Sequence, residues 1–161
     1  MFGLWKTKKI KQEKIRAILQ ALTMMAVSDG DFDPYEQKLI AESIDLLRDH
    51  FNYKGAIEVD FTDENYDLNS LLDDSDKDIL VGLLSAVLLV DDKADYREIM
   101  HLKYFIMKMG FDILAFSELF EDIFNKYRVN PSVYKEYEKY ALKNGTDMAE
   151  KAFANRKKYL G

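Results

Sequence analysis

Apolar residues recur along this chain at the three-to-four-residue spacing of amphipathic helices. In residues 13–28 they form one stripe, made of Ile15, Ile18, Leu19, Leu22, Met25 and Ala26. A second helix is predicted from Pro34 to about residue 50. Residues 76–90 are apolar on nearly all sides, which predicts a central helix with Ser75 as its N-cap.

The same pattern continues toward the C-terminus. It predicts a helix over residues 96–109 that ends at Gly110, a helix over 112–127, a helix opened by Asn130-Pro131 and ended by Gly145, and a last helix over 146–160. Residues 52–69 are predicted as a loop with some extended structure near residues 57–61. With two prolines and seven glycines the chain is poor in turn residues, so an all-α bundle of about seven helices is expected rather than an all-β fold.

Composition narrows the class of protein. A length of 161 residues with 48% hydrophobic residues suits one packed domain. The absence of cysteine excludes disulfides, thiolate metal sites and a cysteine nucleophile. The longest apolar stretch runs from Ile79 to Val90, shorter than the roughly 20 residues that span a bilayer, and no secretory signal is visible. A cytoplasmic location is therefore expected.

Charge is distributed unevenly along the chain. Residues 1–16 carry six cationic side chains against Glu13 and so a net charge of +5, although the whole chain carries −6. The rest is therefore strongly acidic, and an acidic body repels phosphate backbones, so nucleic-acid binding is not expected. The expected organisation is a basic segment over residues 1–12, a helical domain over 13–120, and a C-terminal helical extension over 121–161 packed on that domain.

An eleven-residue motif occurs twice, each time where an apolar helix runs into an acidic turn. Residues 26–36 read AVSDGDFDPYE and residues 88–98 read LLVDDKADYRE. Asp29, Asp33 and Glu36 in the first copy match Asp91, Asp95 and Glu98 in the second. The motif predicts two related helix–turn–helix units.

Two kinds of chemistry explain these acids. Asp33 and Asp95 suit N-caps, and Glu36 and Glu98 then fall at the third helical position of a capping box. Asp29 and Asp91 instead lie near helix C-termini, where the helix dipole disfavours negative charge. The acids could therefore ligate a divalent cation such as calcium, magnesium or manganese. The candidate ligands are Asp29, Asp31, Asp33, Glu36, Asp91, Asp95 and Glu98.

An EF-hand is excluded by the later loop positions. Asp29, Asp31 and Asp33 fit its first three ligand positions, but Pro34 stands at position 6, where glycine is needed, and Ile40 at position 12, where glutamate is needed.

The Ser28–Asp33 turn followed by Glu36, and a second such unit leading to Met109-Gly110-Phe111-Asp112, resemble the repeated unit of the TerB family of tellurite-resistance proteins. The unit is also similar to the domain that precedes the J-domain in DjlA-type co-chaperones. The resemblance covers about residues 13–120. It implies a seven-helix-like bundle with pseudo-twofold symmetry, an acidic surface, and a role in tellurite resistance or a broader stress response as a binding module without catalysis. The acidic positions of the family correspond to Asp29, Glu36, Asp91 and Glu98. The leading interpretation is a bacterial module with two pseudo-symmetric helical hairpins that binds a cation and engages a protein partner. The second copy departs from the family pattern at Asp92 and Lys93.

No enzyme motif accompanies the repeat. Phosphate-binding loops, zinc-protease helices and serine nucleophile elbows are absent from the sequence, and His50 and His101 are far apart. A non-enzymatic role is therefore expected. Two alternatives to a cation-binding module remain open. One is a protein-interaction adaptor whose acids act only as caps. The other is a peripheral contact with the inner membrane surface through Phe2, Trp5, Lys8 and Lys9.

Overall fold

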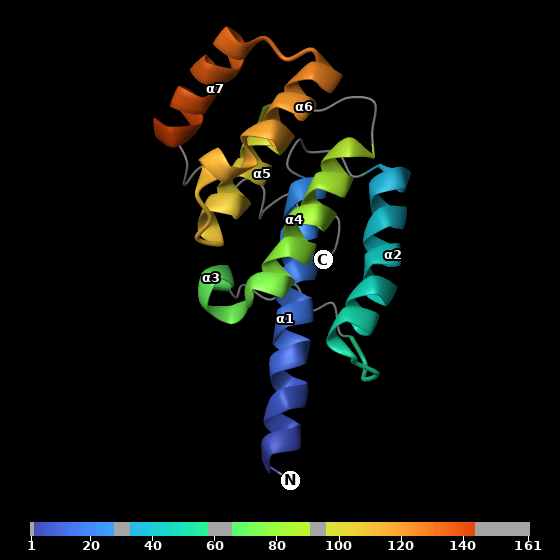
Figure 1. Ribbon diagram of the computed structural model, residues 1–161. Helices are drawn as coiled ribbons and strands as arrows, with labels where there is room; N and C mark the ends of the chain where they lie inside the picture. The colour runs from blue at the N-terminus through green and yellow to red at the C-terminus, as the bar shows by residue number, and fades with distance from the viewer. Residues whose placement is uncertain (1, 28–32, 58–65, 91–95, 144–161) are drawn as a thin grey trace.

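The computed structural model describes residues 2–27, 33–57, 66–90 and 96–143 (Figure 1). Over these ranges the chain forms seven α-helices and one short 3-10 helix, with no strand. The elements are α1 (Phe2–Ala26), α2 (Pro34–Phe51), α3 (Leu68–Leu71), α4 (Asp74–Leu89), α5 (Tyr96–Lys108), η1 (Ile113–Phe116), α6 (Ser117–Tyr127) and α7 (Pro131–Lys143). The predicted all-α bundle is confirmed.

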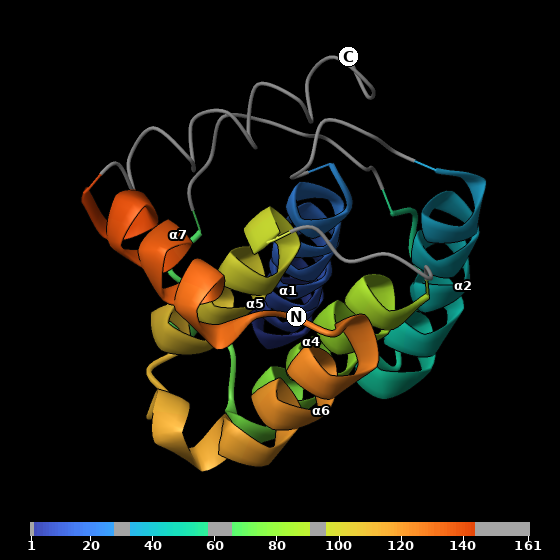
Figure 2. The same ribbon diagram turned by 90° about the horizontal axis from the view of Figure 1, so that it is seen from above.

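Helices α1 and α4 pack against each other at the centre of the bundle, and α2 and α5 each pack on both of them. The view from above shows α1 and α4 flanked by α2 on one side and by α5 and α7 on the other (Figure 2). The stripe predicted for the first helix is wholly buried, and α4 buries most of its apolar residues, as its all-round hydrophobicity predicted.

Several equivalent positions of the sequence repeat are also buried to the same extent. Residues 62 positions apart, such as Ile18 and Leu80 or Leu22 and Leu84, are both completely buried. The helix contacts follow the same rule: α1 packs on α2 as α4 packs on α5, and α1 packs on α5 as α4 packs on α2. Two equivalent hairpins, α1–α2 and α4–α5, therefore build the core.

Local signals placed several helix ends correctly. Asp33 caps α2, with proline at the first helical position as predicted. Gly110 has a φ of +86°, the left-handed conformation expected of a residue that follows a helix. The last predicted helix, over residues 146–160, and most of the segment 57–61 lie outside the described residues.

Other boundaries differ from the prediction. Helix α1 begins at Phe2 rather than near residue 13, because lysine and glutamine have good helix propensity even without an apolar stripe. The N-cap of α4 is Asp73 rather than Ser75, since Asp73 and Asp76 form a reciprocal capping box. The predicted helix over 112–127 divides into η1 and α6, and α3 was not predicted.

The C-terminal helices pack on the second hairpin. The Tyr127 hydroxyl donates to the Leu88 carbonyl oxygen at 2.9 Å, which joins α6 to the end of α4. Helix α7 lies on α5, where Tyr134 is buried against Phe124 and near Tyr96. The predicted boundary at residue 120 falls inside α6, so no break in secondary structure separates the predicted domain from its extension.

Candidate functional site

After the first acidic turn, helix α2 begins with a side-chain cap and a buried glutamate. The Glu36 amide donates to Asp33 Oδ1 at 2.9 Å, which satisfies one of the free amides at the start of α2. The Glu36 residue is only 3% exposed. Asp29 and Asp31 lie outside the described residues.

Helix α5 also has a buried glutamate in its first turn. Glu98 occupies the third position of that helix, as Glu36 does in α2, and is 4% exposed. Asp91 and Asp95 lie outside the described residues. Two glutamates at equivalent places in the repeat are thus both buried.

The two helices that carry these glutamates begin at the same end of the bundle, away from the N-terminus of α1 (Figure 1). Among the residues that the structure describes, no group of three or more acidic or histidine side chains is placed to hold a metal ion. Of the seven predicted ligands, only Asp33, Glu36 and Glu98 fall within that part of the chain.

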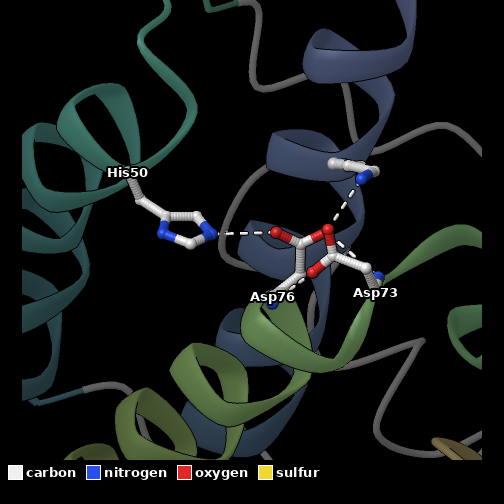
Figure 3. Close-up of polar contacts among 4 residues, drawn as sticks. His50, Asp73 and Asp76 are labelled. Atoms are coloured by element: carbon white, nitrogen blue, oxygen red, sulfur yellow. Dashed lines mark hydrogen bonds and ion pairs between the residues drawn. The ribbon is translucent and has the colours of Figure 1, made fainter.

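A second polar site, which the sequence did not predict, is centred on Asp76 in the first turn of α4 (Figure 3). Its carboxylate accepts from Lys14 Nζ of α1 and from His50 Nε2 of α2, each at 2.8 Å. It also accepts from the Asp73 amide at 3.1 Å. The Asp76 side chain is 4% exposed, so one buried carboxylate joins three helices.

The electrostatics of this network favour the charged form of Asp76. Burial by itself raises the pKa of Asp76, but the hydrogen bonds from Lys14 and His50 and from the Asp73 amide outweigh it, and the pKa lies below its usual range. Because a carboxylate only accepts hydrogen bonds, His50 Nε2 carries the shared proton. These contacts are typical of a structural ion-pair network between helices.

Acid should weaken this network in a defined pH range. A carboxyl whose pKa is lower in the folded than in the unfolded chain contributes stability above the unfolded value, and loses it as the pH falls through the folded value. The free energy of unfolding of the wild type should therefore exceed that of Asp76→Asn at about pH 5, and by less and less from about pH 4 downward. Urea denaturation of both proteins across this range measures the difference. A difference that stays constant down to about pH 2 would contradict it.

The signal that could have revealed Asp76 is its place in the apolar stripe. Asp76 lies four and eight residues before Leu80 and Leu84, and Lys14 stands in the same relation to Ile18 and Leu22. Two oppositely charged residues at inward-facing positions indicate an ion pair between helices. His101, by contrast, has its polar contact within its own helix, α5. Its Nδ1 contacts the Arg97 carbonyl oxygen at 2.6 Å, and burial lowers the pKa of the imidazole.

The predicted membrane or partner residues lie in the first turns of α1. Lys8 and Lys9 are exposed, whereas the side chains of Phe2 and Trp5 lie outside the described part of the chain. No helix in the described ranges combines the length and the apolar character needed to cross a membrane.

We compared the chain with protein-family models, with curated proteins and with solved structures, and none of the three comparisons found a match.

Proposed function

We propose that this protein is a non-enzymatic, TerB-like stress-response module of the cytoplasm that binds a divalent cation at its two acidic turns and presents the resulting surface to a protein partner. The observation that carries the proposal is the paired burial of Glu36 and Glu98, at 3% and 4% exposure, in equivalent first turns. The tellurite-resistance type of role rests on the resemblance of the repeated turn to that family.

The physical argument starts from the local excess of negative charge. A helix dipole stabilises an acid in the first turn by roughly 0.3–1 kcal/mol at the surface. Here each buried glutamate follows a turn with further aspartates. These are Asp29, Asp31 and Asp33 before Glu36, and Asp91, Asp92 and Asp95, with Lys93 among them, before Glu98. Like charges this close in sequence repel one another, and a divalent cation ligated by carboxylate oxygens would offset that repulsion.

One observation favours the second candidate, an adaptor without metal. The Asp33 carboxylate already caps α2 through the Glu36 amide, so at least one predicted ligand has a structural task of its own. In that case the acids shape the two hairpins, and the partner binds to protein surface alone.

Calorimetric titration of metal-stripped protein with calcium, magnesium, manganese and zinc separates the two candidates. We expect one of the hard cations to bind with a dissociation constant of roughly 10⁻⁶–10⁻⁴ M. The double variant Glu36→Gln/Glu98→Gln should weaken that binding at least about tenfold, because each substitution replaces a charged oxygen ligand by a neutral amide.

The matched control is Glu42→Gln/Glu121→Gln, which removes the same charge from exposed positions on α2 and α6. It should bind the cation like the wild type. Since the double glutamine variant alters two buried side chains, the melting temperature of the wild type with the cation and with a chelator supplies a readout that does not depend on the variant's stability. No heat and no change in melting temperature with any of the four ions would refute cation binding and favour the adaptor.

A further inference from the structure

Helix α1 has two parts with different surroundings. From Ile15 to Val27 nearly every side chain is buried in the bundle, whereas residues 6–10 are all exposed. Figure 1 shows this N-terminal part as a helix that extends beyond the other helices. We call residues 2–11, which include this exposed part, the basic arm.

The basic arm concentrates positive charge at one end of an acidic molecule. It carries Lys6, Lys8, Lys9 and Lys11 and no acidic residue, although the whole chain has a net charge of −6. The remaining residues therefore carry −10. The positive arm attracts anionic partners, whereas the negative remainder of the chain repels them.

Distance separates the tip of the arm electrostatically from the buried core of the bundle, although the Lys8 side chain further along the arm lies beside Gly55. Lys6 precedes Ile15 by nine positions, which corresponds to roughly 14 Å of helix at about 1.5 Å per residue. The Debye length in physiological salt is about 8 Å. An anionic surface that touches the tip of the arm is therefore largely screened from the acidic body.

We propose that the basic arm docks this protein on the surface of an anionic lipid bilayer. Charge alone would suit any polyanion, but the arm also contains apolar residues among its lysines. Ile10 is 48% exposed, and the sequence places Phe2, Leu4 and Trp5 in the first turns. A bilayer interface takes up both kinds of side chain, because the lysines meet lipid phosphates while the apolar residues enter the headgroup region. A nucleic-acid duplex offers only the phosphates.

The experiment uses the full chain and its single tryptophan. Trp5 is the only tryptophan in the sequence and lies in the arm, so its fluorescence reports directly on docking. Wild-type protein is titrated with vesicles of phosphatidylcholine containing about a third phosphatidylserine, and with vesicles of phosphatidylcholine alone. We expect binding and a blue shift of the Trp5 emission with the anionic vesicles only.

Two variants of equal net charge test the location of the contact. The arm variant is Lys6→Gln/Lys8→Gln/Lys9→Gln/Lys11→Gln. The control variant is Lys38→Gln/Lys54→Gln/Lys135→Gln/Lys139→Gln, at exposed positions elsewhere. The arm variant should lose about a hundredfold in vesicle partitioning, whereas the control should partition like the wild type.

Three results would overturn the proposal: absence of wild-type binding to anionic vesicles, equal loss in both variants, or tighter binding to a DNA duplex than to the vesicles. Since seven of the eight lysines are exposed and Lys11 is only half-buried, circular dichroism should show the same helix content for both variants and the wild type. The result is independent of the cation titration, because the arm lies at the other end of the bundle from the first turns of α2 and α5 (Figure 1).

Discussion

Replacing Asp76 by asparagine should lower the free energy of unfolding by about 3 kcal/mol, since removing one member of a buried ion pair leaves the other charge uncompensated. Asparagine keeps the size of the side chain but removes the charge that Lys14 and His50 share. Lys14 and His50 are themselves mostly buried, at 17% and 19% side-chain exposure, so water replaces the lost contacts poorly. Urea denaturation at about pH 7 measures the loss.

The control for this prediction is Asp78→Asn in the same helix. Asp78 lies two residues further along α4 and is exposed, so the same chemical change there should cost less than about 0.5 kcal/mol. Equal effects of the two substitutions would show that the general charge of the helix, and not the buried network, determines stability.

The second large effect is expected in the core, where the repeat makes a paired prediction. Leu22 in α1 and Leu84 in α4 are equivalent positions, and both have 0% exposure. Truncating either leucine to alanine removes three buried carbon atoms and leaves a cavity, which typically costs about 2–5 kcal/mol. We expect Leu22→Ala and Leu84→Ala each to destabilise the protein by about 3 kcal/mol, measured by urea denaturation.

Leu114→Ala is the matched control, because this leucine is 74% exposed in η1. Its truncation should change the free energy of unfolding by less than about 0.5 kcal/mol. If one of the two core variants were as mild as this control, the two hairpins would not share the core equally, and the structural equivalence of α1 and α4 would be wrong at that position.

The two residues of the ion pair occupy equivalent positions in the repeat. Lys14 and Asp76 are themselves separated by 62 residues, the offset that relates the two hairpins. Equivalent residues meet each other only close to a twofold axis, so their contact indicates that a pseudo-twofold axis passes between α1 and α4. Two identical charged residues there would repel one another. Because the first copy has a lysine and the second an aspartate at the equivalent position, the two side chains attract each other.

The sequence alone was sufficient for the longer helices of the described ranges and for the buried apolar positions of α1 and α4, but not for α3 or for the division of residues 113–127 into η1 and α6. The stripe from Ile15 to Ala26, the apolar helix α4 and the caps at Asp33 and Gly110 depend on residues within one or two turns, because helical hydrogen bonds and side-chain contacts link positions three and four apart. The repeat and the contrast between the basic N-terminus and the acidic remainder are likewise properties of the linear chain.

Only the tertiary structure decided which polar residues meet. Lys14, His50 and Asp76 lie on three helices, and their contacts depend on the angle and height at which those helices pack, which side-chain fit across the whole core sets. The burial of Glu36 and Glu98 has the same origin: each looks locally like an exposed capping residue, and only neighbouring parts of the fold remove it from water. Periodicity determines which face of a helix is apolar. The partners of a polar residue on that face lie far away in the chain, so only the packing of the helices determines them.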